Sequence, residues 1–375
     1  MKLLLIYGQF IGLNPVIRIT NMDVSKMRFT FCSLRFMYCC LIGACQLIFT
    51  ALHINRFVRT SVTITSLSYV SFYAGTFLTT ALFLRIAANW PALMKKIANS
   101  SLDKYIDATL PTKCLCTTVI MLSLALFEHV LSQNTKLMNS IHCATENVSA
   151  YEIFLGKTFP WFKELQGPIN LPIGVFFHIM NIISTITWSY SDVFLVCMSL
   201  YLVSIIDKIN KTINEVDHRF YHPTFWSTIR EDYTRAADLV TSFDDVISGL
   251  MLISFASNLF FICLQLFHIL SSRGMWDNLI YFTFSLIFVL VRYLAVSLAA
   301  ASIHTASQKP AAALYMIPST AYCSEVQRFI EQVHGSCVAL TGLKFFYVTK
   351  GLVLSVAGTI VTYELVLLQF NGENN

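Results

Sequence analysis

Long apolar segments, separated by shorter polar ones, dominate the pattern of this chain. A transmembrane helix needs about 20 consecutive, mostly apolar residues. Seven segments reach that length: roughly 31–53, 64–88, 113–133, 171–206, 246–271, 278–303 and 346–370. They are far too long for the strands of a membrane barrel, and they lack the alternation of such strands. The pattern therefore predicts an all-α integral membrane protein with seven transmembrane helices.

The polar segments divide the chain further. Residues 1–30 form an N-terminal segment whose first 13 residues are apolar up to the break at Asn14-Pro15, which is typical of a helix lying at the membrane interface. Residues 31–303 hold the first six spans. We expect the charged segment 207–245 to extend them into the cytosol as helix. Helical spacing of apolar residues in 304–345 predicts further cytosolic helices that pack against it. The seventh span is 346–370, followed by a short tail, 371–375.

The composition excludes a soluble protein. Hydrophobic residues make up 55% of the 375 residues and charged residues only 13%, where a typical soluble chain has about 25% charged residues. The mean hydropathy is +0.62. The net charge of +5 carries no sign of nucleic-acid binding, because the basic residues lie in loops between apolar segments and form no stripe with aromatic residues.

The positions of the basic residues predict the orientation in the membrane. With the N-terminus in the cytosol, 15 Lys and Arg fall in inner segments and 6 in outer ones. Such an excess is typical of cytosolic loops, so we expect a cytosolic N-terminus and an extracellular C-terminus. The sequon Asn147-Val148-Ser149 then lies in an outer loop, where Asn147 could be glycosylated.

This orientation is opposite to that of G-protein-coupled receptors. The chain also lacks an Asp-Arg-Tyr element after the third span and an Asn-Pro-x-x-Tyr element in the seventh. A metabotropic receptor is therefore the less favoured reading of a chain with seven spans.

No motif in the sequence predicts an enzyme, a metal site or a cofactor. Gly156-Lys157-Thr158 resembles the end of a phosphate-binding loop, but Tyr151 stands where the first Gly is required. His218 and His222 have the spacing of a metal-binding pair on a helix, but Arg219 replaces the Glu of a metalloprotease motif and no third ligand is evident.

The end of the seventh span carries a more specific signal. Residues 362–370 read Thr-Tyr-Glu-Leu-Val-Leu-Leu-Gln-Phe, which resembles the C-terminal signature of insect gustatory receptors. Ser254-Phe255-Ala256-Ser257-Asn258 and Glu128-His129 are similar to segments of the sugar-receptor branch of that family. The resemblance covers essentially the whole chain and is weakest in the first 30 residues.

The resemblance implies a tetrameric ligand-gated channel in the plasma membrane of sensory neurons. It implies passage of cations without strong selectivity, and assembly as a homotetramer or as a heterotetramer with related gustatory receptors. It also implies that the seventh helix of each subunit lines a central pore. Thr362, Val366 and Gln369 share one face of that helix at spacings i, i+4 and i+7. By the resemblance, Gln369 and Phe370 are the expected gate residues, whereas Tyr363 and Glu364 are expected to contact neighbouring helices.

The expected ligand is a mono- or disaccharide bound among the first six helices, in the outer half of the membrane. Sugars present apolar ring faces and a rim of hydroxyls, so their sites combine aromatic and hydrogen-bonding side chains. Polar residues inside a membrane suggest function. The candidates are Tyr69, Tyr73, Glu128, His129, His178, Asn181, Trp188, Asp192, Asn258, Gln265, His268 and Tyr281.

The charged residues inside the spans have different expected roles. Glu128 and Asp192 are the most interesting candidates, because a carboxylate can accept two sugar hydroxyls at once. Arg292 is expected to be a structural counter-ion rather than a ligand contact.

The alternatives are a gustatory channel for a non-sugar tastant, which a strongly apolar pocket would favour, and, less favoured, a metabotropic receptor or a transporter.

Overall fold

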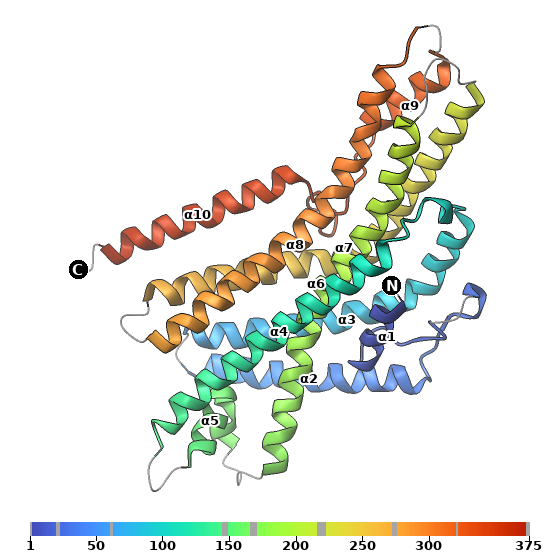
Figure 1. The fold of residues 1–375 in the computed structure, drawn as a ribbon. Helices are drawn as coiled ribbons and strands as arrows, with labels where there is room; N and C mark the ends of the chain where they lie inside the picture. The colour runs from blue at the N-terminus through green and yellow to red at the C-terminus, as the bar shows by residue number, and fades with distance from the viewer. Residues whose placement is uncertain are drawn as a thin grey trace.

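The computed structural model describes residues 2–19, 23–60, 63–144, 149–165, 171–215, 223–271, 276–319 and 322–372. Helices dominate it (Figure 1). The longer helices are α2 (Leu34–Arg59), α3 (Ile64–Asn99), α4 (Leu110–Ile141), α6 (Leu171–Asn214), α7 (Pro223–Ser271), α8 (Trp276–Tyr315) and α10 (Lys350–Gly372). The shorter ones are α1 (Lys2–Phe10), α5 (Ala150–Thr158) and α9 (Ser324–Gly335).

Six helices, α2, α3, α4, α6, α7 and α8, are long and apolar enough to cross a membrane. They contain the first six predicted spans, apart from a few residues at the start of the first, so the chain is a multi-pass membrane protein. The helix that contains the fourth span, α6, has 44 residues and continues past residue 206 into the segment that was expected to extend the spans as helix. In α10 the apolar stretch identified among the described residues is only Lys350–Tyr363. A seventh crossing therefore stays a prediction.

The helix starts follow local sequence rules. Thr63 caps α3 by accepting from the Ser66 backbone N–H at 3.1 Å, and the Ser66 hydroxyl in turn accepts from the Thr63 N–H. Ser33 caps α2 in the same way through the Phe36 N–H. Pro111 stands in the first turn of α4, where a missing N–H costs nothing. These caps satisfy backbone donors that a helix end leaves without partners.

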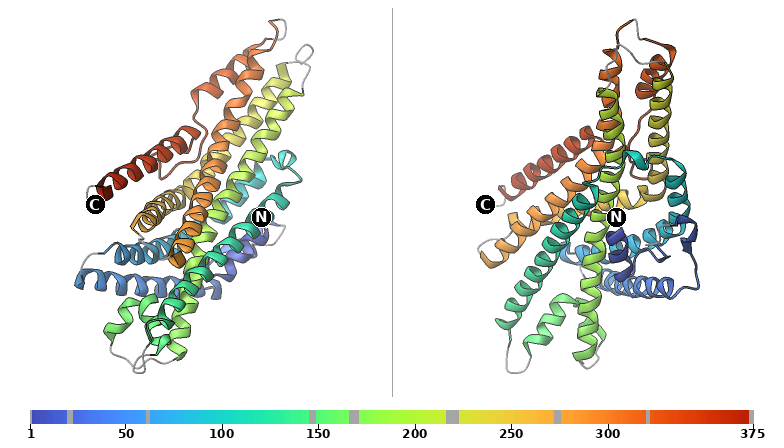
Figure 2. Two further views of the ribbon diagram at one scale, coloured as in Figure 1. Left: turned by 60° about the vertical axis from the view of Figure 1, so that its left-hand side comes forward. Right: turned by 45° about the vertical axis from the view of Figure 1, so that its right-hand side comes forward.

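Helix α6 runs through the middle of the bundle, with the other spans around it (Figure 2). Every residue from Ser189 to Ser199 is buried, so this central part of the helix faces protein on all sides. In contrast, α4 has the smallest buried share among the six spans, 17% of its most apolar window. A helix that is apolar all round but exposed is expected to face lipid.

The N-terminal segment folds onto the bundle. Leu4, Leu5 and Leu13 are buried, and the Tyr190 hydroxyl of α6 donates to the Leu4 carbonyl at 3.0 Å. After α1, two short strands pair antiparallel, β1 (Val16–Ile17) with β2 (Arg28–Phe29). The helix forms where the sequence predicted it, but the docking and the strand pair were not predicted. Its place at the membrane interface stays a prediction.

One end of the molecule is formed by the last parts of α6 and α8, the first part of α7 and α9, which lie together at the top of Figure 1. We call this group the distal bundle. Arg230 of α7 pairs with Glu325 of α9 at 2.9 Å, and the ring of Tyr233 lies 5.2 Å from that of Phe329. Val326, Phe329 and Val333 of α9 are buried. The helical packing expected for this region is therefore present, while its cytosolic location is still a prediction.

Helix α10 leaves the bundle and points away from it (Figures 1 and 2). Val353 near its start is buried, whereas Leu354 is 74% exposed and Val361 is 54% exposed. The exposed apolar surface of this helix is too large to face water, so lipid or another protein chain must cover it.

Candidate ligand-binding cavity

A cavity of about 390 Å³ lies between α3, α4, α6, α7 and α8, and we call it the central cavity. It is lined by most of the residues that the sequence suggested: Tyr69, Tyr73, Glu128, His129, Asn181, Trp188, Gln265, His268 and Tyr281. Its volume falls in the range of small-molecule sites. The structure therefore brings together candidates from five helices that are far apart in the sequence.

Aromatic rings form one wall of the central cavity. Tyr69 and Tyr73 lie one helical turn apart on α3, and both stack on His53 with ring centroids 5.2 and 4.9 Å away. The Trp161 indole N–H donates to Nε2 of His53 at 3.1 Å, which makes Nε2 the acceptor nitrogen. Because these rings hold one another in place, the cavity presents a preformed aromatic wall.

Glu128 supplies the carboxylate of the cavity. Its Oε1 accepts from Ser285 at 3.0 Å and from Tyr281 at 3.3 Å. Within the described residues no hydrogen bond reaches Oε2. Gln265 donates to the Ser285 hydroxyl at 2.9 Å and so supports this arrangement. One carboxylate oxygen is therefore fixed by the protein, and the other remains available to a hydroxyl in the cavity.

Asp192 has a different position from the one expected. It is fully buried and does not line the cavity. Oδ1 accepts from Ser254 at 2.5 Å, and Oδ2 accepts from Arg292 Nε and Nη2 at 2.9 and 2.6 Å. Asn258 also donates to Oδ2, at 3.2 Å. Both oxygens of Asp192 are thus engaged, and neither Asp192 nor Asn258 reaches the cavity directly.

Arg292 has two roles in the structure, and the sequence suggested only the first of them. It pairs with Asp192, as expected of a counter-ion, and it also lines the central cavity. Its guanidinium lies 4.1 Å from the centre of the Trp188 ring, which is close enough for a cation–π interaction. No hydrogen bond from the described part of the chain involves Nη1. Arg292 is therefore a candidate ligand contact that the sequence analysis missed.

Several further polar residues line the cavity and were not singled out from the sequence. Helical spacing could have found two of them: Ser132 lies one turn from Glu128 on α4, and Ser285 lies one turn from Tyr281 on α8. Buried polar atoms without a partner among the described residues belong to Gln133, Thr158, Trp188, Ser189 and Gln265 of the lining. Such an atom costs about 1–3 kcal/mol. A polar ligand could offset part of this cost.

His178 lies apart from the central cavity. Its ring stacks on Phe154 of α5, with ring centroids 5.1 Å apart, and it does not line the cavity. Together with Asp192 and Asn258 it is one of three candidates that the structure does not place in the lining.

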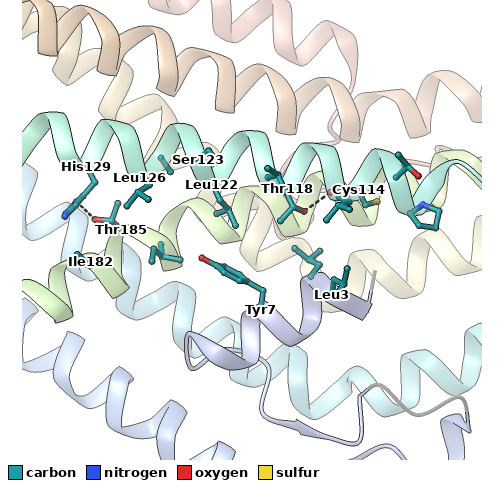
Figure 3. Close-up of a pocket in the computed structure, with 17 residues that line it drawn as sticks. Leu3, Tyr7, Cys114, Thr118, Leu122, Ser123, Leu126, His129, Ile182 and Thr185 are labelled. Atoms are coloured by element: carbon teal, nitrogen blue, oxygen red, sulfur yellow. Dashed lines mark hydrogen bonds between the residues drawn. The ribbon is translucent and has the colours of Figure 1, made fainter.

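A second, larger hollow of about 940 Å³ runs along α4 between α1 and α6 (Figure 3). Its lining is mostly apolar, with Leu3, Leu122 and Leu126 among the labelled residues. The Thr118 hydroxyl donates to the Cys114 carbonyl at 2.7 Å and is therefore engaged. We call this hollow the α4 groove. Among the described residues that line it there is neither a carboxylate nor a guanidinium, so it suits a sugar less well than the central cavity does.

The two hollows share a wall. His129 and Thr185 line both of them, and His129 Nδ1 lies 3.1 Å from the Thr185 hydroxyl. Figure 3 shows this pair at one end of the α4 groove.

The expected pore residues lie on α10. Val366 is 42% exposed, and the Thr362 hydroxyl donates to the Gly358 carbonyl at 3.0 Å. Gln369 and Phe370 occupy the last turns of the same helix, but their side chains lie outside the described part of the structure. Asn147, His218 and His222 also lie outside the described residues. Among the residues described, no three His, Cys, Asp or Glu side chains gather as a metal site would require.

The comparisons with known proteins agree with this fold. The structure of the insect olfactory receptor OR5 from Machilis hrabei, in complex with eugenol, is similar to this chain with a TM-score of 0.72. The sequences are 15% identical, and the match covers 98% of this chain and 97% of the receptor. At that identity the likeness shows a shared fold.

The sequence relatives show the family. The gustatory receptor for sugar taste 64f of Drosophila melanogaster is 31% identical, over 99% of this chain and 80% of the relative. The gustatory receptor 5a for trehalose of the same organism is 31% identical, over 97% of this chain and 83% of the relative. Residues 1–375 match the family described as "Trehalose receptor". This chain therefore belongs to the trehalose receptor family, among the gustatory receptors for sugar taste.

Proposed function

We propose that this protein is a taste receptor that acts as a sugar-gated, non-selective cation channel in the plasma membrane of sensory neurons. The observation that carries the proposal is the central cavity, whose lining combines aromatic rings with a carboxylate and a guanidinium. Two relatives whose names refer to sugar taste and to trehalose support the ligand class.

The chemistry of the cavity fits a mono- or disaccharide. The rings of Tyr69 and Tyr73 offer apolar faces for a sugar ring, as Trp188 does from α6. Oε2 of Glu128 can accept from a sugar hydroxyl, and Nη1 of Arg292 can donate to one. A site that hydrogen-bonds the hydroxyls of its ligand rejects compounds without them, because its buried polar groups would then lack partners.

A non-sugar tastant is the nearest alternative, and the cavity argues against it. A strongly apolar site would favour that ligand, but the lining contains Glu128, Gln265 and Arg292. The α4 groove is the more apolar of the two hollows, and it opens along the helix whose side chains are the most exposed among the spans.

The proposed pore is built from four copies of α10. Its exposed apolar surface supports an assembly in which other subunits cover it. Four copies of the face that carries Thr362, Val366 and Gln369 would surround a narrow channel. An apolar ring of Phe370 at its outer end would stop ions by excluding water. The subunits are four identical chains or a mixture with related gustatory receptors, each with its N-terminus in the cytosol.

Whole-cell recording tests the proposal. Cells that express this chain, alone or with a related sugar-taste subunit, are exposed to trehalose, sucrose, glucose and fructose while surface protein is quantified. We expect a sugar-evoked current that is inward at negative voltage, through a channel that both Na⁺ and K⁺ can cross. Uptake of a sugar without current would indicate a transporter, and a current that depends on intracellular GTP would indicate a metabotropic receptor.

A further inference from the structure

The segment that connects the distal bundle to α10 has an unusual backbone. Residues 336–349 lie between α9 and α10 and fold back on themselves, with the Val348 N–H donating to the Leu340 carbonyl at 2.8 Å. Within this linker, Leu343 and Lys344 both have positive φ angles, 49° and 63°. Residues with a Cβ rarely adopt this conformation, and it persists only where the surroundings enforce it.

A single carboxylate on α7 enforces it. Asp244 is buried, and its Oδ1 accepts from the Thr341 backbone N–H at 2.6 Å. Its Oδ2 accepts from the Thr341 hydroxyl at 2.8 Å and from Lys344 Nζ at 2.6 Å. The Leu343 N–H donates to the Ser248 carbonyl, one turn further along α7, at 3.3 Å. We call these contacts the Asp244 clamp.

The charge on Lys344 fits this arrangement. The ammonium group of a lysine is charged at neutral pH, and hydrogen bonding to Asp244 raises the pKa of Lys344 further. Asp245, the next residue on α7, lies 3.1 Å from the same ammonium. The clamp thus combines a buried acceptor with a donor that reaches it from the exposed side of the linker.

The linker also contacts the helices that bound the central cavity. The ring of Phe346 lies 5.7 Å from that of Phe255 on α7, and Phe255 lies 5.5 Å from Tyr293 on α8. Ser254, the neighbour of Phe255, donates to Asp192, and Arg292, the neighbour of Tyr293, pairs with the same carboxylate. These contacts, joined through the backbone at Ser254–Phe255 and at Arg292–Tyr293, therefore link Arg292 at the cavity to the residues just before α10.

We propose that Asp244 is a positioning residue for gating: it holds the start of α10, and the Asp244 clamp transmits occupancy of the central cavity to that helix. The proposal rests on the sugar-gated channel proposed above. Ligand contact at Arg292 shifts the pair with Asp192, and with it the packing of α7 against the linker. The clamp makes α7 and the linker move as one unit, so the shift reaches α10.

Lys344→Ala is the central variant, because its side chain is 57% exposed and its removal leaves no cavity in the core. Lys344→Arg keeps the positive charge and should restore the wild-type response. Lys113→Ala is the matched control: Lys113 is 59% exposed and pairs with Asp107 at 3.0 Å near the start of α4, and no hydrogen bond among the described residues joins it to the linker. Asp244→Asn removes the charge of the acceptor itself. All four variants are compared at equal surface expression.

The first readout is the concentration–response curve for whichever of trehalose, sucrose, glucose and fructose opens the wild type. We expect Lys344→Ala to change the half-maximal concentration by about 2- to 30-fold, or to raise the resting current, while Lys113→Ala has no effect. A double-mutant cycle of Lys344→Ala with Arg292→Lys should show non-additive effects. Wild-type behaviour of both Lys344→Ala and Asp244→Asn, or additive effects in the cycle, would overturn the proposal.

The second readout does not depend on current. Hydrogen–deuterium exchange of the purified protein should be faster in residues 336–349 and in the first turns of α10 when Lys344 is replaced by Ala, and unchanged in Lys113→Ala. Equal exchange in wild type and Lys344→Ala would overturn the positioning role, even if no sugar opened the channel. If the wild type showed no sugar-evoked current but exchange was faster in Lys344→Ala as expected, only the proposed function would be contradicted.

Discussion

Nη2 of Arg292 lies 2.6 Å from Oδ2 of Asp192, and both side chains are almost completely buried. The pair joins the middle of α6 to the middle of α8, where two charges in an apolar environment require each other. Because Arg292 also lines the central cavity, the same contact both stabilises the bundle and sets the position of a candidate ligand contact.

The first prediction concerns the stability of this pair. Asp192→Ala should destabilise the protein by about 3–5 kcal/mol, because it leaves a buried guanidinium without its counter-charge. Thermal unfolding of the detergent-purified protein measures the change. Asp238→Ala, at an exposed position of α7, is the control and should behave as wild type. Equal stability of the two variants would show that the pair is not essential to the fold.

A second prediction tests the carboxylate of the cavity. Glu128→Gln should raise the half-maximal sugar concentration by about 10- to 150-fold, the equivalent of one hydrogen bond to a charged group. Surface expression should hold, because the amide can still accept from Ser285 and Tyr281. Glu152→Gln on the exposed side of α5 serves as the control. A normal dose–response curve for Glu128→Gln would place the sugar site elsewhere.

The third prediction distinguishes the two hollows by filling each of them from the same helix. Ser132→Trp puts a large side chain into the central cavity, and Ser123→Trp puts one into the α4 groove. We expect the sugar response to be lost in the first variant and kept in the second, at matched surface expression. The reverse result would assign the sugar to the groove.

A fourth prediction addresses the gate. Replacing Phe370 with Ala should leave a channel that conducts without ligand, because the apolar ring that excludes water is removed. The resting current in sugar-free solution measures this leak. Phe127→Ala, at an exposed position on α4, provides the comparison. A resting current as low as that of the wild type would refute the gate assignment.

Hydropathy alone located the six spans because each is a long apolar helix with polar ends. It could not locate the docking of α1, since this depends on contacts such as Tyr190 with Leu4, whose residues are 186 positions apart. Nor could it show the turn of the linker, where Asp244 of α7 binds Thr341 and Lys344.

The candidate site was predicted in part. Polar residues in the outer halves of the spans identified Tyr69, Glu128 and Gln265, because few polar side chains are tolerated there unless they are used. The same rule could not tell a carboxylate that faces a cavity from one that faces a cation. Asp192 was therefore expected in the cavity, and Arg292 was expected to be a structural counter-ion without a named partner; the structure pairs the two.

Recording from excised outside-out patches tests the central claim most directly. The patches hold this chain, with a related sugar-taste subunit added if the chain alone is silent, and the solution on the cytosolic side contains no GTP. The proposed channel predicts cation-carrying single-channel openings within milliseconds of sugar reaching the outer face. Patches that contain surface-labelled protein and show no openings with trehalose, sucrose, glucose or fructose would contradict it.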